Sequence, residues 1–200
     1  SRRQGTIGNK LFHNILHQEF NGVVYPVNPN AKAGASVKAY PPVLDIPGEV
    51  DLAVVIVPAG IVHQVVEQCG QKGVQGIVVI SAGFGESGAE GIDRQEKLLE
   101  IARNYGMRLL GPNCMGIINT DPQVNMNATF SSIFPPAGNI ALGTQSGALG
   151  LAILEYARSL NVGLSTFVSI GNRADVSNND LLQYWAEDSA TDIILLYLES

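Results

Sequence analysis

Cysteine is scarce in this chain of 200 residues, and so is positive charge. The two cysteines, Cys69 and Cys114, form no metal-binding or redox spacing, and two free thiols are typical of a cytoplasmic protein. The chain has 12 Lys and Arg against 18 Asp and Glu, and a net charge of −6 disfavours nucleic acid or an anionic membrane as a partner. No apolar run approaches the roughly 18 residues of a membrane span, and nothing resembles a signal peptide. We therefore expect a cytoplasmic protein without a membrane partner. A small polyanionic ligand stays open, because local backbone donors can outweigh net charge.

Histidine is equally rare, with three residues in the chain. His13 and His17 are four positions apart, so they share one face of a helix, as paired metal ligands do. No third ligand accompanies them. We predict no metal site.

The composition that remains is apolar and rich in glycine, with 46% hydrophobic residues and 22 glycines. This is typical of a compact α/β protein of one large or two small domains. Apolar runs that look like buried strands alternate with segments of helical periodicity, and the loops between them are short. That order predicts a parallel, doubly wound sheet. Strands are expected at 23–29, 51–58, 75–81 and 107–110, and helices around 11–16, 62–69 and 98–105.

The periodicity fades between Gly111 and Gly138, a stretch rich in Asn and Pro that we interpret as a linker. The alternation then starts again, which predicts one domain over residues 1–125 and a second over 126–200. Strands are expected in the second domain at 140–142, 165–170 and 192–198. Its first helix is expected to bury Leu149, Ala152, Ile153, Tyr156 and Leu160, and its second helix Leu181, Leu182 and Trp185.

Two loops enter helices in a way that suits an anion. Residues 143–147, Gly-Thr-Gln-Ser-Gly, follow a strand and leave unpaired N–H groups at a helix start, where phosphate is stabilised. An ordinary turn with Ser146 as the N-cap explains the same residues. Residues 5–8, Gly-Thr-Ile-Gly, form the second loop, and its glycines let the backbone approach a phosphate closely. Positive charge lies nearby in Arg2, Arg3, Lys10 and Lys32.

A dinucleotide-binding fingerprint is present as Gly83, Gly85 and Gly88, but its context is wrong. The fingerprint normally follows the first strand of its sheet, with an acidic residue about 20 positions later. Here it follows a late strand, and no acid stands at that distance. Glu86 would lie inside the loop and repel a pyrophosphate. We therefore disfavour a nicotinamide or flavin site here.

Four motifs together resemble a known family. VYPVNP at 24–29, SAGFGES at 81–87, LGPNCMG at 110–116 and TQSGAL at 144–149 are similar to the nucleoside-diphosphate-forming acyl-CoA synthetases. The α subunit of succinyl-CoA ligase shares the pattern more distantly. The resemblance covers essentially all 200 residues. It implies a Rossmann-like CoA-binding domain followed by a partial flavodoxin-like, doubly wound domain.

The resemblance also implies which residues hold CoA. Loops at the carboxyl ends of strands would hold its nucleotide part first and its pantetheine arm further on. Turn geometry explains the prolines and Asn113 equally well, and Cys114 could be a packed apolar residue. The residues implied are Gly5, Thr6, Ile7, Gly8, Asn28, Pro29, Lys32, Val57, Pro58, Ile80, Ser81, Ala82, Asn113 and Cys114.

In the same family a helix N-terminus faces a phosphorylated histidine. The matching residues here are Gln145, Ser146, Gly147 and Ala148, and Glu199 matches the carboxylate that orients the histidine. The family's histidine lies beyond position 200, and none of His13, His17 and His63 matches it. The resemblance further implies ADP/ATP or GDP/GTP with Mg at a nucleotide-grasping domain or subunit outside this chain, a small carboxylic acid as substrate, and an oligomer.

The function expected from the resemblance is the conversion of acyl-CoA, phosphate and ADP or GDP into acid, CoA and ATP or GTP through a phosphohistidine. Because the matching histidine and the nucleotide-grasping domain lie outside these 200 residues, we expect the 200 residues alone to be inactive. The family's first strand is missing before Ser1, so we also expect them to be poorly soluble or partly unfolded unless residues before Ser1 exist. An alternative is the ligase-like regulatory region of a protein lysine acetyltransferase, which would sense acyl-CoA without the histidine. A nicotinamide-dependent Rossmann enzyme is a third hypothesis, and CoA binding would eliminate it.

Overall fold

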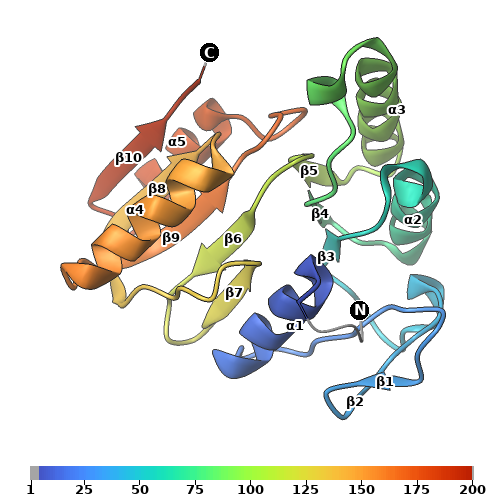
Figure 1. Cartoon of the computed structure of the whole chain (residues 1–200), viewed down its shortest axis with the longest axis horizontal. Coiled ribbons are helices and arrows are strands. Elements are labelled where there is room, and N and C mark those ends of the chain that lie inside the picture. The colour runs from blue at the N-terminus through green and yellow to red at the C-terminus, as the bar shows by residue number, and fades with distance from the viewer. Residues whose placement is uncertain (1–4, 200) are drawn as a thin grey trace.

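The computed structural model describes residues 5–199, which form two β-sheets with helices packed against them (Figure 1). The first sheet is parallel, in the order β3-β4-β5, with β3 at Leu52–Val55, β4 at Gly76–Val79 and β5 at Arg108–Leu110. Three helices accompany it: α1 (Ile7–His17), α2 (Ala59–Lys72) and α3 (Ala89–Asn104). Short elements complete this unit, namely β1 (Ala33–Gly34), β2 (Val37–Lys38), η1 (Val43–Asp45) and η2 (Gly85–Ser87).

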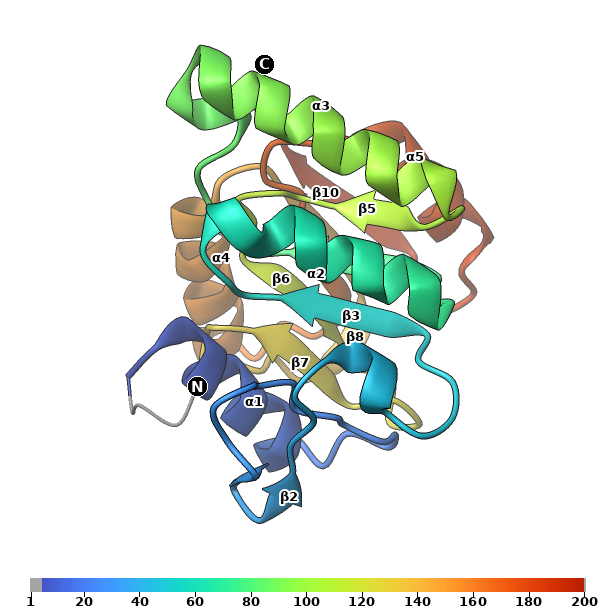
Figure 2. The ribbon, with the colours of Figure 1, turned by 90° about the vertical axis from the view of Figure 1, so that its right-hand side faces the viewer.

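Both faces of the first sheet are covered, which explains why its strands are nearly continuous apolar runs. Side chains alternate across a strand, so Ile77 and Val79 of β4 pack against α2 and α3, whereas Val78 packs against α1. Figure 2 shows α2 and α3 side by side on one face of this sheet. Helices α2 and α3 therefore bury the apolar stripes expected there, through Val62, Val66, Cys69, Leu98 and Ala102.

The second sheet has five strands in the order β10-β8-β9-β6-β7. Helix α4 (Gly147–Ser159) covers one face and α5 (Asn178–Glu187) the other. Strands β8, β9 and β10 are parallel, as expected, whereas β6 and β7 pair antiparallel. The strand bounds are Gly116–Asn119 for β6, Met126–Thr129 for β7, Ala137–Thr144 for β8, Leu164–Ser169 for β9 and Ile193–Tyr197 for β10.

The linker expected between Gly111 and Gly138 is therefore wrong, because β6 and β7 lie within it. Their polar residues hide the hairpin from a periodicity argument. Asn127 is fully buried, and its side chain accepts hydrogen bonds from the backbone N–H and the hydroxyl of Thr129 and donates to the carbonyl of Ser131. The predicted domain boundary after residue 125 falls between these two paired strands, and the change of sheet comes between β5 and β6.

Two further expectations differ from the structure. Residues 23–29 form no strand, and one isolated bridge joins Val27 to Tyr40. Strand β3 is paired with β4 on one side, and no strand among residues 5–199 pairs with its other side. Residues 23–29 therefore have no neighbouring strand with which to form a sheet. Helix α4 faces inward through Gly150, Leu154 and Ala157, whereas Ala152, Tyr156 and Leu160 are exposed. A Cβ on Gly150 would lie 2.8 Å from Thr144 Cγ2. Helix α4 therefore packs closely against β8 at Gly150, because glycine has no side chain, and this contact determines which side of the helix faces inward.

The two units are joined along β5 by the segment 172–176 of the second unit. The N–H groups of Asn172, Ala174 and Val176 donate to the carbonyls of Pro112, Gly111 and Leu109, respectively. The segment thus runs antiparallel to β5. Arg108 at the start of β5 also forms ion pairs of 2.9 Å with Asp175 and Asp180. None of the helices within residues 5–199 is long and apolar enough to cross a membrane.

Candidate functional site

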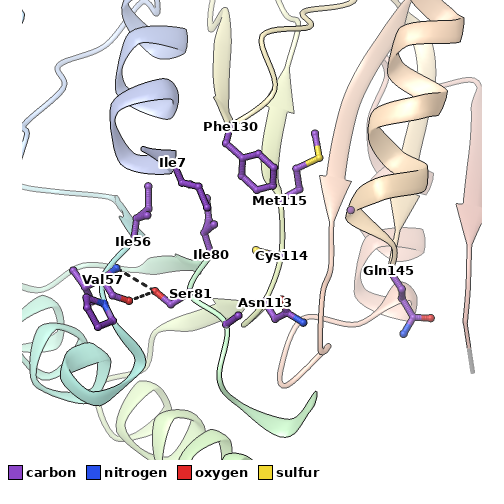
Figure 3. Close-up of a pocket in the computed structure, with 13 residues that line it drawn as sticks. Ile7, Ile56, Val57, Ile80, Ser81, Asn113, Cys114, Met115, Phe130 and Gln145 are labelled. Carbon is purple, nitrogen blue, oxygen red and sulfur yellow. Dashed lines mark hydrogen bonds between the residues drawn. The ribbon is translucent and has the colours of Figure 1, made fainter. Parts of the chain in front are cut away.

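A cleft of about 500 Å³ lies where the two units meet (Figure 3). Its walls are the loops after β3, β4 and β5, the first residue of α1, and the turn from β8 into α4. Figure 3 shows the residues that follow the strands of the first sheet on one side and Gln145 of the second unit on the other. The carboxyl ends of parallel strands are the usual ligand sites of open α/β folds. The position of the cleft therefore agrees with the strand order.

Most of the cleft lining was expected from the sequence. Ten predicted site residues line it, namely Ile7, Val57, Pro58, Ile80, Ser81, Ala82, Asn113, Cys114, Gln145 and Gly147. Three lining residues were missed: Ile56, Met115 and Phe130. Ile56 lies inside the strand predicted at 51–58 and directly follows the observed β3, which ends at Val55, so an accurate strand end would have identified it. Met115 and Phe130 belong to the stretch interpreted as a linker.

The ends of the three strands of the first sheet are tied to one another by hydrogen bonds. The Ser81 hydroxyl donates to the carbonyl of Val57 at 2.6 Å and accepts from its N–H at 3.1 Å. The Asn113 N–H donates to the Ser81 carbonyl at 3.0 Å. Because both functions of the Ser81 hydroxyl are used by backbone groups, Ser81 shapes the cleft wall and is not an activated nucleophile.

Cys114 presents a neutral thiol to the cleft. Its Sγ donates to the Val79 carbonyl at 3.4 Å, and the side chain is buried. Burial raises the pKa of the Cys114 thiol to about 12, since the thiolate would lose its hydration. A thiolate nucleophile is therefore absent at neutral pH.

The lining is otherwise uncharged. Among the described residues of the cleft there is no Asp, Glu, Lys, Arg or His. Its most apolar part is made by Ile7, Ile56, Ile80, Met115 and Phe130. A ligand segment in this cleft is recognised by shape and hydrogen bonds rather than by opposite charge.

The loop over residues 5–8 starts α1, with Gly5 at a φ of 82° and Thr6 at the N-cap. Gly8 is the second residue of the helix, so the first N–H groups of α1 point out beside the cleft residue Ile7. Lys10 on the same helix is exposed. Arg2 and Arg3, which we expected to add positive charge, lie outside the described residues.

The predicted nucleotide-binding residues in the next loop do not line the cleft. The Asn28 side chain accepts from the N–H of Asn30 at 2.9 Å, which is the turn geometry considered above. Pro29 follows within that turn, and Lys32 is exposed at the base of the hairpin of β1 and β2. Their predicted contact with a nucleotide stays a prediction.

The start of α4 agrees with the predicted Ser146 N-cap, whose hydroxyl oxygen accepts from the Leu149 N–H at 3.4 Å. Gln145 and Glu199, expected near each other, are brought together, because the Gln145 side-chain oxygen accepts from the Glu199 N–H at 2.8 Å. The Glu199 carboxylate is exposed, and so is Ala148. Gly147 lines the cleft and Ser146 and Ala148 stand beside it.

The fingerprint loop of residues 83–88 is occupied by its own glutamate. A carboxylate oxygen of Glu86 accepts from the N–H groups of Gly83 at 2.5 Å and Phe84 at 3.1 Å. These donors would otherwise face a phosphate. The rejection of a dinucleotide site on sequence grounds thus agrees with the geometry.

The paired histidines show no sign of metal ligation. The rings of His13 and His17 are stacked with centroids 5.9 Å apart. Within residues 5–199 no three His, Cys, Asp or Glu side chains gather as metal ligands would.

Two family models match the chain. Residues 1–120 match a CoA binding domain, and residues 137–200 match a succinyl-CoA ligase like flavodoxin domain. The unmatched interval contains β7, the second strand of the antiparallel hairpin.

Curated relatives and a solved structure extend the match over the full 200 residues. The chain is 48% identical to the acetate–CoA ligase (ADP-forming) I of Archaeoglobus fulgidus, covering 100% of this chain and 28% of that protein. It is 44% identical to the α subunit of acetate–CoA ligase (ADP-forming) I of Pyrococcus furiosus, of which it covers 44%. A structure of acetyl-coenzyme A synthetase 1 from Candidatus Korarchaeum cryptofilum, in complex with phosphate and ADP, superposes with a TM-score of 0.95 at 42% identity. That match covers all of this chain and 42% of the solved one.

The chain therefore spans less than half the length of these relatives. The chain belongs to the family of nucleoside-diphosphate-forming acyl-CoA synthetases, with a CoA-binding domain joined to a succinyl-CoA ligase-like flavodoxin domain.

Proposed function

We propose that this chain provides the CoA site and the phosphate-facing helix of an ADP-forming acid–CoA ligase. The reaction is acyl-CoA + phosphate + ADP ⇌ carboxylic acid + CoA + ATP. The observation that carries the proposal is the shared cleft, in which the strand ends of the CoA-binding domain face the start of α4. Relatives at 44–48% identity are named as ligases of this type.

In this proposal CoA lies along the carboxyl edge of the first sheet. Its nucleotide part is held at the loop of residues 5–8, where the N-terminus of α1 favours phosphate. Asn28, Pro29, Lys32, Val57 and Pro58 flank that part. The pantetheine arm then follows the uncharged wall made by Ile80, Ser81, Ala82, Asn113 and Cys114 toward α4.

The start of α4 receives phosphate in the same proposal. Gly147 and Ala148 offer the first N–H groups of that helix, Ser146 and Gln145 precede them, and a helix N-terminus stabilises the negative charge of a phosphohistidine. The histidine, the nucleotide and Mg belong to sequence outside residues 1–200. In the proposal the Glu199 carboxylate orients that histidine, and the hydrogen bond from the Glu199 N–H to the Gln145 side chain supports a position near the start of α4.

The uncharged lining of the cleft favours an acyl group that carries no charge of its own. A dicarboxylate would carry a second charge into the cleft, where no described side chain could pair with it. An unpaired buried charge is strongly unfavourable. We therefore propose a small monocarboxylic acid as the substrate.

Calorimetric titration of the intact protein with CoA tests the site. Replacing Gly8 by Val places a branched side chain at the second residue of α1 and obstructs the approach of phosphate. We expect CoA affinity to fall at least tenfold, about 1.4 kcal/mol. Gly60→Val is the matched control, since Gly60 is also the second residue of its helix but has open space around it and does not line the cleft. A folded Gly8→Val protein with unchanged CoA affinity would refute the site.

A further inference from the structure

Asn172 of the second unit lies at the centre of a polar cluster beside the cleft. Its side-chain nitrogen donates to a carboxylate oxygen of Glu86 and, at 2.9 Å, to the side-chain oxygen of Gln95. Its side-chain oxygen accepts from the Asn113 side-chain nitrogen at 3.3 Å. Its backbone N–H donates to Pro112 at 2.9 Å. One residue of the ligase-like unit thus holds three side chains of the CoA-binding unit.

The chemistry of these partners fixes which way the Asn172 amide points. A carboxylate only accepts hydrogen bonds, so the side facing Glu86 must be the nitrogen. Gln95 gives the same answer independently, because its oxygen also accepts from the Gly85 backbone N–H at 3.3 Å and so faces Asn172 as an acceptor. Both hydrogens of the Asn172 nitrogen are then used, and its oxygen is left for Asn113.

The orientation of Asn113 follows from that of Asn172. Asn113 must present its nitrogen to the Asn172 oxygen, which leaves its own oxygen as the acceptor for anything in the cleft that it lines. The backbone of Asn113 is held as well, with a φ of 56° and its N–H on the Ser81 carbonyl. The cleft therefore offers a hydrogen-bond acceptor of set direction in a wall that is otherwise mostly apolar.

The carboxylate at the far end of this chain of bonds is kept ionised. Burial alone would raise the pKa of Glu86, but the hydrogen bonds from Asn172 and from the N–H groups of Gly83 and Phe84 outweigh it. The net shift of the Glu86 pKa is downward. At neutral pH the acceptor that orients Asn172 is therefore always present.

We propose that Glu86 and Asn172 are positioning residues that set the Asn113 carboxamide to accept a hydrogen bond from an amide N–H of the pantetheine arm. The inference rests on the proposed CoA site. It makes a residue of the ligase-like unit part of the recognition of CoA, without that residue touching the ligand. The nucleotide part of CoA has no role in this contact.

The test compares two ligands, CoA and adenosine 3′,5′-bisphosphate, which lacks the pantetheine arm. In the intact protein we expect Asn172→Ala to weaken CoA binding about five- to tenfold, the range of one hydrogen bond, and to leave the bisphosphate unaffected. Asn113→Ala should give the same loss, and the double variant no further loss, because one residue acts through the other. Asn139→Ala is the control, since it removes an exposed Asn–Asp hydrogen bond within the second unit.

A second variant keeps the size of the positioning group. Glu86→Gln retains an oxygen for Gly83 and Phe84 but turns an N–H toward Asn172, so the Asn172 amide reverses and the Asn113 acceptor is lost. We expect the same selective loss of CoA affinity. Equal losses for both ligands, or additive losses in the double variant, would show a merely structural role and overturn the inference. Failure of the unmodified protein to bind CoA would instead refute the proposed function.

Discussion

Gly171 packs against the backbone of Pro112 and Asn113 where the two units meet, and its replacement by alanine tests that junction. Its φ is 59°, and a Cβ there would lie 2.3 Å from the Pro112 carbonyl oxygen and 2.6 Å from that of Asn113. Because both neighbours are backbone atoms, neither can move aside alone. The 171–172 loop must shift, which breaks the bonds of Asn172 to Pro112 and to Asn113.

The expected loss in the free energy of unfolding of Gly171→Ala has two parts. A left-handed alanine costs about 1 kcal/mol, and two lost hydrogen bonds add about 1 kcal/mol each. We expect the free energy of unfolding to fall by about 3 kcal/mol, which lowers the melting temperature of a chain of this size by about 9 °C. Gly73→Ala isolates the first part, because Gly73 has a φ of 85° but nothing within 4 Å of its Cβ position. That control should lose about 3 °C. Equal shifts in the two thermal melts would show that the close approach at Gly171 contributes nothing.

Three further outcomes are expected. Gly147→Asp places a negative charge where phosphate is proposed to bind, so labelled nucleotide should give less phosphoenzyme while CoA affinity stays unchanged. Gly147→Ala is the control, because its Cβ would lie 3.7 Å from Met115 Cβ, an ordinary contact. Equal phosphoenzyme yields in the two variants would refute the role of Gly147. Because the pKa of the Cys114 thiol is about 12, about one Cys114 thiol in ten thousand is ionised at pH 8. A thiol reagent should therefore label Cys114 only after the protein unfolds. Rapid labelling of the native protein would contradict the burial of Cys114. Hydrogen bonds from Ser177 and Arg108 lower the pKa of Asp180, so Asp180→Asn should lower the melting temperature at pH 7. The difference in melting temperature between the variant and the unmodified protein should shrink as the pH falls below the ordinary Asp pKa of about 3.9. A difference that does not change with pH would exclude the ionised Asp180 as its cause.

The elements that sequence reasoning located are those whose burial leaves a periodic signal. Strands β4 and β8 are covered on both faces, so they are apolar runs that need no knowledge of their partners. The loops after β3, β4 and β5 followed from that, and with them most of the cleft. The roles of particular residues were predicted from the resemblance to a family, because neither the periodicity nor the spacing of residues indicates such roles.

What sequence reasoning missed depends on contacts between distant residues. The hairpin of β6 and β7 is stabilised partly by buried polar groups such as Asn127, which look like loop residues until their partners are known. Asn172 is 86 residues from Glu86 and 59 from Asn113, and a polar side chain has no preferred period. The inward face of α4 was misplaced because the helix is apolar on several sides, and the position of Gly150 against Phe167 decides between them.

The segment 172–176 also covers one edge of the first sheet. An uncovered strand edge is a template for association with further chains, and this segment lies along the edge of β5 and the residues after it, with three backbone hydrogen bonds to residues 109–112. The edge of β3 has no such cover from residues 5–199. A shortened protein ending at residue 120 would therefore expose the edge of β5 to its neighbours and self-associate more readily than a protein that retains the segment.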